Sequence, residues 1–236
     1  MREQTEESMD AETLAERLGE MARELSGAHD LDELLQLIVD LGEAYLEGCD
    51  GVSLMLIGKN RQISSPAYSS KVAYDSDQAQ YETDEGPCLD ALRQHETIVI
   101  DDLETETRWP DYRARALELG VRSMISFRLF AHKDTMGALD FYAATPQAYD
   151  RTSRLLGQVF ASHASVALKA AITTAGLEAT IHTRDVIGQA KGIIMSHHHL
   201  TADAAFELLR KISQQMNRPL REVADDIATT GEIPDA

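Results

Sequence analysis

The amino-acid sequence predicts an α+β fold: an antiparallel sheet with flanking helices, joined by a long helix to a small three-helix all-α bundle. Apolar residues recur at helical spacing up to about residue 48, at strand-like spacing over residues 51–145, and at helical spacing again from residue 151. The order helix, strands, helices, strands, helix is typical of a mostly antiparallel sheet that helices cover on one face. Three short amphipathic segments close the chain and predict the bundle.

The composition indicates a globular protein. The 236 residues suffice for one large domain or two small ones, and 43% of them are hydrophobic. No stretch approaches the roughly 18–20 apolar residues of a membrane span, and the acidic N-terminus lacks the apolar region of a secretory signal. Two cysteines in such a chain indicate reduced thiols and a cytoplasmic protein. The net charge of −18 argues against nonspecific binding to nucleic acid or membranes but permits a small basic patch.

Residues 1–29 predict an acidic N-terminal helix, and a second helix follows the break at "SGAHD". The apolar residues of the first recur at spacings of four, three and four: Leu14, Leu18, Met21 and Leu25. One face of the second helix carries Leu31, Leu34, Leu35, Ile38 and Leu41. Residues 1–48 hold fourteen Asp and Glu but three Lys and Arg, which indicates a solvated outer face. Contact with a partner or a dimer mate is the alternative.

Strands and helices alternate over residues 51–145. The strand-like segments are "GVSLMLIG", "RQISSPAYSS", "ETIVIDDL" and "RSMISFRLFAHKDTMGALDFYAAT", and "AHKDTMG" predicts a hairpin connection within the last. Between them, "PCLDALRQ" follows Gly86 and begins with a proline suited to a first helical turn. The helix "PDYRARALEL" ends at Gly120, in the position that glycine favours after a helix.

A single helical pattern covers residues 151–179. Its apolar and small residues alternate at spacings of three and four, as in a coiled coil: Leu156, Val159, His163, Val166, Ala170, Thr173 and Leu177. The seam is poor, because His163 and Thr173 occupy core-type places and Ala170 is small. We interpret the segment as a signalling helix that pairs with its copy in a dimer; a helix packed on its own domain's sheet is the alternative.

The stretch "IHTRDVIGQAKGIIMSHHHL", residues 181–200, predicts a helix with two distinct faces. At about 100° per residue, an apolar stripe gathers Val186, Ile187, Ala190, Ile193 and Ile194. The adjoining face gathers Arg184, Gly188, Lys191, Met195 and His198. Gly188 and Gly192 each cost about 1 kcal/mol of helix stability against Ala, which indicates that a second helix or a ligand approaches the backbone closely. The adjacent Lys191 favours a polyanionic ligand.

Two shorter helices complete the bundle. "TADAAFELLRKISQQM" begins after Thr201, a plausible N-cap, and its stripe is Ala205, Leu208, Leu209, Ile212 and Met216. "RPLREVADDIATTG" has Pro219 at an early helical position and ends at Gly231, and its stripe is Leu220, Val223, Ala224 and Ile227. Phe206 lies beside the first stripe, so we expect it in the core rather than in a stacking surface.

The segments "DEGPCLDAL", "DLETETRWPDY", "GVRSMISFRL" and "MGALDFYA" resemble the GAF domain family, over roughly residues 30–172. The resemblance implies a small-molecule sensory or dimerisation module with a pocket beside the sheet. No chromophore or catalytic signature accompanies it. Cys88 is interpreted as a buried small hydrophobe at a helix start. A thiol sensor or attachment point is the alternative, since a helix N-terminus can lower the pKa of a thiol.

The segments "RDVIGQAKGIIM", "AAFELLRKIS" and "NRPLREVADDI" resemble the ANTAR domain. That resemblance implies RNA binding and transcription antitermination, with dimers that bind tandem stem-loops in nascent mRNA leaders. The residues predicted to bind RNA are Arg184, Gly188, Lys191, Gly192, Met195, His198, Arg210, Lys211 and Arg218.

The adjacent His197, His198 and His199 do not predict a metal site, because neighbouring helical residues point about 100° apart. We interpret them as solvated histidines near a helix end, and a cationic edge of the RNA site is the alternative. Asp101, Asp102, Asp140 and Lys191 follow the residue order of a receiver domain. However, no strands follow Asp140, which argues against that alternating fold.

The predicted domains are an N-terminal acidic helix (1–29), a GAF-like sensory domain (30–150), a signalling helix (151–179) and an ANTAR-like RNA-binding domain (180–236). The predicted function is an RNA-binding antitermination regulator with a sensor domain. The alternative is a ligand-binding sensory dimer whose helical tail docks on a protein partner. We expect no enzyme activity, because no nucleophile–base pair is visible, and we expect no cofactor.

Overall fold

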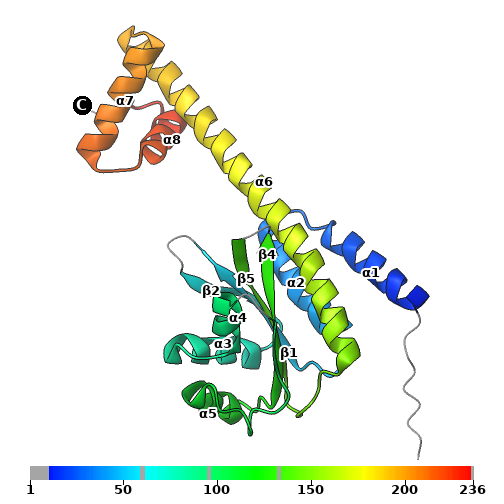
Figure 1. Ribbon diagram of the computed structural model, residues 1–236. Helices are drawn as coiled ribbons and strands as arrows, with labels where there is room; N and C mark the ends of the chain where they lie inside the picture. Colours follow the sequence, from blue (N-terminus) through cyan, green and yellow to red (C-terminus); the bar gives the residue numbers. More distant parts are fainter. Residues whose placement is uncertain (1–10, 59–61, 95–96, 132–133, 235–236) are drawn as a thin grey trace, which may run out of the picture. The chain divides into compact units, whose positions relative to one another are not determined.

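The computed structural model describes residues 11–58, 62–94, 97–131 and 134–234, so residues 1–10 of the predicted acidic helix lie outside it. The chain divides into two compact units, Met1–Ile172 and Thr173–Ala236. The predicted α+β fold is confirmed (Figure 1). One helix, α6 (Arg151–His198), crosses the unit boundary without a break, so residues 151–179 and the first helix of the predicted bundle are one element.

The first unit is built on a five-stranded sheet of order β2-β1-β5-β4-β3, and every neighbouring pair is antiparallel. The strands are β1 (Gly51–Ile57), β2 (Ile63–Tyr68), β3 (Ile98–Ile100), β4 (Ser123–Ala131) and β5 (Asp134–Ala143). The pairing of Ala131 with Asp134 confirms the predicted hairpin, although its turn residues 132–133 lie outside the described part of the chain.

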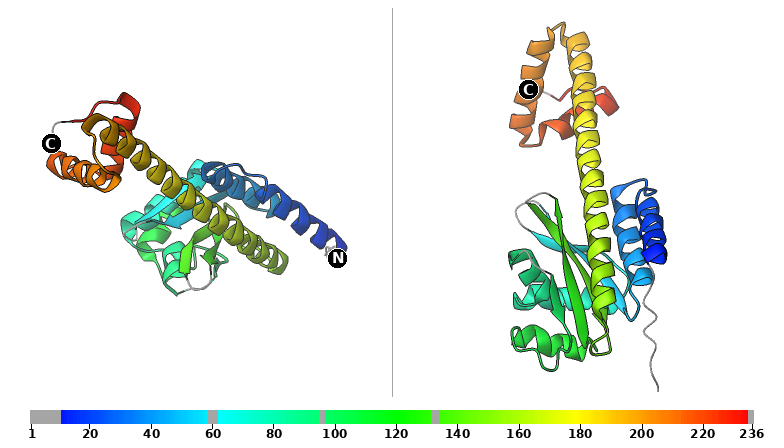
Figure 2. Two further views of the ribbon diagram at one scale, coloured as in Figure 1. Left: turned by 90° about the horizontal axis from the view of Figure 1, so that it is seen from above. Right: turned by 45° about the vertical axis from the view of Figure 1, so that its right-hand side comes forward.

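Helices cover both faces of this sheet, so the expectation that one face is covered was wrong (Figures 1 and 2). On one side lie α1 (Ala11–Leu25), α2 (Leu31–Tyr45) and the N-terminal part of α6. On the other lie α3 (Lys71–Thr83), α4 (Pro87–Gln94) and α5 (Pro110–Glu118). Alternate side chains of a strand point to opposite faces. In β5, for example, Phe141 packs on the first side and Tyr142 on the second.

The N-terminal part of α6 packs directly on the sheet. Phe160, Ala164 and Leu168 are buried there. A Cβ added at Gly157 would lie 2.4 Å from the Phe127 ring, so this close approach requires glycine. The alternative interpretation, a helix packed on its own domain's sheet, therefore holds for one face of this helix. Met21 and Leu25 of α1 are buried on the same side of the sheet, whereas the side chains of Leu14 and Leu18 lie outside those described.

The helix α3 is not indicated by the sequence pattern. Its buried residues are Ala73, Ser76, Asp77, Ala79 and Gln80. Because most of that face is polar, it has no apolar stripe to mark a helix. The polar face of α3 lies against the sheet, where it forms part of the buried polar cluster described below.

Several predicted helix ends are confirmed, although Pro219 precedes α8 as its N-cap and does not occupy an early helical position. Pro87 opens α4, and Gly120 follows α5 with a φ of 86°. The Thr201 hydroxyl accepts a hydrogen bond of 3.4 Å from the Ala204 amide at the start of α7 (Ala202–Met216). Gly231, with a φ of 74°, ends α8 (Leu220–Thr230).

The second unit has its own apolar core. It joins the C-terminal part of α6 to α7 and α8 and buries Val186, Ala190, Ile194, Ala205, Leu209, Ile212, Val223, Ala224 and Ile227. The predicted three-helix packing is therefore confirmed. Met216, which the pattern places on the α7 stripe, is 40% exposed instead, because it lies in the last turn of that helix.

By length and composition alone, α6 is apolar enough to cross a membrane, although we expected no such stretch. One such helix is weak evidence for a membrane span. Phe160, Ala164 and Leu168 of α6 are buried against the sheet of the first unit, which accounts for part of its apolar character.

Candidate nucleic-acid interface

The core of the second unit determines which residues of α6 face outward. Val186, Ala190 and Ile194 recur every four residues and are buried, as the helical wheel predicts. Ile187 and Ile193 are half-buried beside them. The face that adjoins this stripe is therefore left to Arg184, Gly188, Lys191, Met195 and His198.

Gly188 and Gly192 leave a bare stretch of backbone on that face. Both glycines are exposed, and a Cβ added at either would meet no described atom within 4 Å. They lie one helical turn apart and therefore share a side of α6. No described part of the chain explains why this helix carries glycine rather than alanine at either position.

Lys191 lies between the two glycines and reaches toward α7. Its Nζ sits 5.8 Å from the centroid of the Phe206 ring, within the range of a cation–π contact. Phe206 is half-buried and does not belong to the buried cluster of this unit. The expectation that Phe206 lies in the core was therefore wrong. Met195 is half-buried and packs against that cluster, which limits the surface it offers.

The remaining predicted cations differ in their partners. Arg210 forms an ion pair with Glu207 at 2.6 Å. Arg218 pairs with Asp226 at 2.7 Å and with Glu222 at 3.6 Å; hydrogen bonds from its guanidinium to Asp226 help to raise the pKa of Arg218. Arg184 and Lys211 are exposed and form no ion pair with any described residue.

Arg221, in the first turn of α8, is a further exposed cation without an ion pair among the described residues, and the sequence patterns do not mark it. Exposed cations follow no periodic spacing in the sequence, so Arg221 becomes a candidate only once the fold of the bundle is known. The histidines at the end of α6 are all exposed, and the rings of His197 and His198 lie 5.1 Å apart. His199 has a left-handed backbone with a φ of 54°, which ends the helix.

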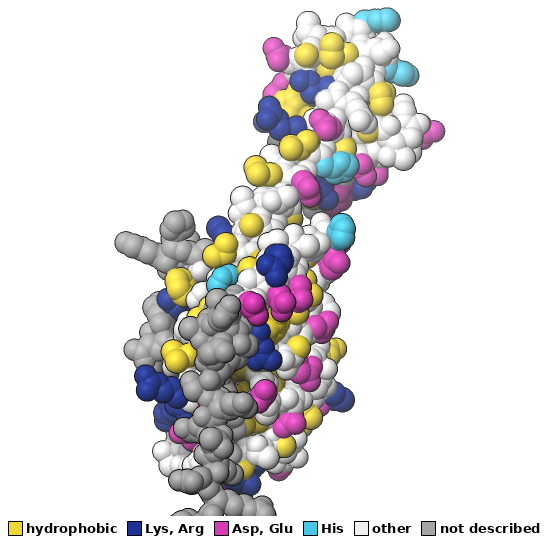
Figure 3. Space-filling view, turned by 90° about the vertical axis from the view of Figure 1, so that its right-hand side faces the viewer, with side chains coloured by type: hydrophobic (Ala, Val, Ile, Leu, Met, Phe, Trp, Pro, Cys, Tyr) yellow, Lys and Arg dark blue, Asp and Glu magenta, His cyan; other side chains and the backbone are white. Residues whose placement is uncertain are grey.

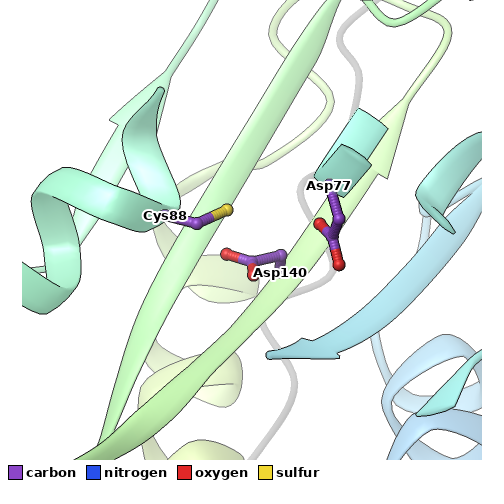
Figure 4. Close-up of side chains that lie close together, drawn as sticks. All are labelled: Asp77, Cys88 and Asp140. Carbon is purple, nitrogen blue, oxygen red and sulfur yellow. The ribbon is translucent and has the colours of Figure 1, made fainter. Parts of the chain in front are cut away.

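The first unit contains a second candidate site, a buried polar cluster between the sheet and helices α3 and α4. Asp140 of β5 pairs in register with Ser53 of β1 and Ser126 of β4, so the three side chains form a polar row across the sheet. Asp77 of α3 and Cys88 of α4 face this row (Figure 4). All five residues are fully buried.

Hydroxyl groups hold the Asp77 carboxylate in place. It accepts a hydrogen bond of 2.9 Å from Ser53 Oγ, and two further hydrogen bonds from Ser65 and Tyr142. Burial raises the pKa of Asp77, against the opposing effect of these donors. The pKa of Asp140 is also raised, first by burial and then by the neighbouring Asp77.

Cys88 is fully buried at the start of α4 and belongs to the apolar cluster on this side of the sheet, as the interpretation of a buried small residue expects, but its Sγ also contacts polar side chains. Gln80 donates to its Sγ at 2.8 Å, and the Gln80 side-chain oxygen accepts from the Cys88 amide at 2.9 Å. Burial and the carboxyls of Asp140 and Asp77 raise the pKa of Cys88 well above its usual value. The alternative interpretation of Cys88, in which a helix N-terminus lowers the pKa of a sensor thiol, is not supported, because burial and two acidic neighbours outweigh the helix end.

A surface groove of about 370 Å³ lies between α3 and α5, lined by Asp75, Gln78, Ala79, Glu82, Arg115, Glu118 and Leu119. None of these residues belongs to the sheet, so the groove differs from the pocket that we expected beside the sheet. Asp101 and Asp102 follow β3 directly and pair with Arg154 and Arg122. The antiparallel sheet and these ion pairs exclude the receiver arrangement.

Comparisons with known proteins find a family match in each of the two units. A family model of the GAF domain matches residues 28–169, and a model of the ANTAR domain matches residues 175–227. No curated protein matches the chain.

Among solved structures, the GAF domain of Acinetobacter phosphoenolpyruvate-protein phosphotransferase has a TM-score of 0.54 at 13% identity, over 69% of this chain and 97% of its own. Free methionine-R-sulfoxide reductase from Neisseria meningitidis, solved with its substrate, has a TM-score of 0.55 at 18% identity, over 71% and 95%. The Stigmatella aurantiaca phytochrome photosensory core module has a TM-score of 0.61 at 14% identity, over 89% of this chain and 46% of its own.

At such identities the structural similarity shows the fold alone. GAF and ANTAR domains are regulatory rather than enzymatic, although one of these GAF-fold neighbours is an enzyme. A GAF domain supports a sensor, and an ANTAR domain supports an RNA-binding antitermination regulator. The chain belongs to the GAF domain family and carries an ANTAR domain after it.

Proposed function

We propose that this protein is a cytoplasmic antitermination regulator that binds tandem stem-loops in nascent mRNA leaders as a dimer, under the control of a small-molecule ligand of its GAF domain. The observation that carries the proposal is the bare backbone at Gly188 and Gly192, flanked by Arg184 and Lys191. Two helix-interior glycines cost about 2 kcal/mol together, and no described contact in the chain compensates for that cost.

A nucleic acid fits this surface for chemical reasons. Cations neutralise phosphates, and bare helix backbone allows a sugar–phosphate chain to approach more closely than any side chain would. Unpaired loop bases stack on aromatic rings and Arg planes. The half-buried Phe206 ring, with the Lys191 ammonium 5.8 Å from its centroid, supplies both an aromatic edge and a charge.

The charge balance favours a target with two binding sites. Residues 177–236 hold six Lys and Arg and nine Asp and Glu, a net charge of −3. A site with so little positive charge gains a weak electrostatic contribution from phosphates. Two such sites that bind one RNA molecule together compensate for the weak affinity of each, because the second binding event occurs at a high effective concentration.

The exposed side of α6 supports pairing of two copies. Leu155 and Val166 are 60% and 73% exposed, and Leu177 and Ile181 are 60% and 59% exposed. Eleven residues separate Leu155 from Val166 and Val166 from Leu177, which is close to three helical turns. These side chains therefore lie along one exposed stripe of α6, and such a stripe of large apolar residues favours pairing with a second apolar surface. Figure 3 shows hydrophobic side chains reaching the surface among charged ones.

The test is binding of the full chain to leader RNAs with two stem-loops, against controls in which one stem-loop is deleted. We expect salt-sensitive binding that is at least tenfold tighter to two stem-loops, and a complex that holds two protein chains. Equal affinity for both RNAs would contradict the tandem model. Absence of hairpin-specific binding would instead favour the alternative, a sensory dimer whose tail docks on a protein partner.

A further inference from the structure

The buried polar cluster has a feature that RNA recognition does not use. A carboxylate oxygen of Asp77, the Cys88 Sγ and a carboxylate oxygen of Asp140 all lie within 4.8 Å of one another (Figure 4). They come from α3, α4 and β5, and all three side chains are fully buried. Such a group of donor atoms inside a domain core requires a balancing charge or bound protons.

The Asp140 carboxylate is the clearest candidate ligand in this cluster. Both of its oxygens are buried without a well-formed hydrogen bond to any described residue, and the Oγ of the adjacent Ser126 also has none. The Cys88 thiol and the Ser126 hydroxyl lie close enough to lower the pKa of Asp140, but burial and Asp77 outweigh them. Among the described residues, no lysine, arginine or histidine forms an ion pair with Asp140 or Asp77. A buried carboxylate without partners is costly, so its oxygens are available for a bound cation.

The surroundings already orient the other two donors. Three hydroxyl groups, from Ser53, Ser65 and Tyr142, fix the Asp77 carboxylate. Gln80 donates to Cys88 Sγ at 2.8 Å, and a donor in this place stabilises a thiolate. Hydrogen bonds of this kind commonly orient the ligands of a metal and strengthen its binding.

We propose that Asp77, Cys88 and Asp140 bind one Zn²⁺ ion, or a divalent transition metal of similar preference, in the core of the GAF domain. Zn²⁺ accepts thiolate and carboxylate ligands in tetrahedral geometry, with bond lengths of about 2.0–2.3 Å. These lengths place neighbouring donor atoms about 3.5 Å apart, so the cluster contracts slightly around the ion. Three protein ligands leave the fourth position to water or to an exogenous ligand.

Binding exchanges the metal for protons. The Cys88 thiol releases its proton to solvent when sulfur bonds to the ion, and any proton held by the two carboxyls is also released. Two carboxylates and one thiolate then carry three negative charges against two positive charges. Because all three donors are buried, we expect the ion to enter while the domain folds or during opening of α3 and α4.

The experiment uses the full chain, unfolded with a chelator and refolded with Zn²⁺ or Co²⁺. His197, His198 and His199 can bind metals at the surface, so all proteins carry glutamine at these three positions. We expect one ion per chain, a higher Tm than in the metal-free protein, and a thiolate-to-cobalt charge-transfer band in the near ultraviolet. Cys88→Ala should abolish that band. Cys49→Ala is the matched control, because Cys49 is the other free thiol and lies outside the cluster, and it should keep the band.

Two results would overturn the site: refolded parent protein without bound metal or without a thiolate band, or an unchanged band in Cys88→Ala. If Cys88→Ala does not fold, Asp140→Asn provides a second variant, since it keeps the side-chain shape and removes the charge. It should bind Zn²⁺ at least tenfold more weakly than the parent. Equal affinity would exclude Asp140 as a ligand. RNA binding is measured separately, so failure here leaves the antitermination proposal intact.

Discussion

Alanine at Gly188 and Gly192 should stabilise the ANTAR domain and weaken its RNA binding. Both positions lie inside α6, where glycine has no conformational advantage, and an added Cβ meets no described atom within 4 Å. A destabilising core substitution can abolish RNA binding simply because it unfolds the domain. Here the two effects have opposite signs, so a defect in RNA binding cannot be attributed to unfolding.

The expected gain in stability is about 0.5–1 kcal/mol for each substitution, because alanine loses less backbone entropy than glycine when a helix forms. For a domain of this size, 1 kcal/mol raises the Tm by roughly 4–8 °C. If RNA contacts the backbone at the glycines, each new methyl group overpacks that contact by about 1–3 kcal/mol. That penalty corresponds to a loss of roughly 5- to 150-fold in affinity.

The matched control is Gly176→Ala. Gly176 also lies in α6, is exposed, and has no described atom within 4 Å of an added Cβ. It should raise the Tm by a similar amount and leave RNA affinity unchanged. Thermal unfolding and titration of a two-stem-loop RNA measure both quantities on the same samples.

The proposed contact is refuted if Gly188→Ala and Gly192→Ala bind the RNA as tightly as the parent while the Tm rises. That outcome would show that the glycines are not in contact with RNA. A fall in Tm would show instead that the backbone at these positions needs glycine for a structural reason.

Three further predictions concern charge, pairing and acid stability. Lys191→Ala should weaken RNA binding about tenfold and lower its salt dependence with little change in Tm; an unchanged salt dependence would move the interface elsewhere. Val166→Glu, at a 73% exposed site, should lower the dimer fraction in sedimentation and reduce two-stem-loop affinity more than single-stem-loop affinity, unless pairing uses another surface. Hydrogen bonds from the Arg108 side chain, and to a smaller extent from the backbone N–H groups of residues 107 and 108, lower the pKa of Glu106 to about 2. The ionised Glu106 carboxylate therefore stabilises the folded protein by about 1–2 kcal/mol after allowance for solvent screening. This contribution is present above about pH 4.5 and is lost as the pH falls toward 2. Glu106→Gln should destabilise the protein at pH 7 but not at pH 2 in denaturant titrations, and equal destabilisation at both pH values would exclude the ionic contribution.

Elements with an apolar buried face could be predicted from sequence, because burial leaves a regular spacing of apolar residues. The stripe of Val186, Ala190 and Ile194 identifies the core side of α6 and, by exclusion, the face that carries Lys191. The helix end at Gly120 is similarly local, since a left-handed backbone favours glycine whatever the rest of the fold does.

Tertiary structure alone revealed the features that depend on residues far apart in the chain. The helix α3 escaped prediction because its buried face presents Ser76, Asp77 and Gln80, and a polar face has no hydrophobic period. Helices on the second face of the sheet could not be assigned, because amphipathic spacing shows that a helix buries one side but not against which surface. Asp77, Cys88 and Asp140 carry no shared motif. They become neighbours only because the antiparallel sheet places the middle of β5 beneath the start of α4 and the buried side of α3.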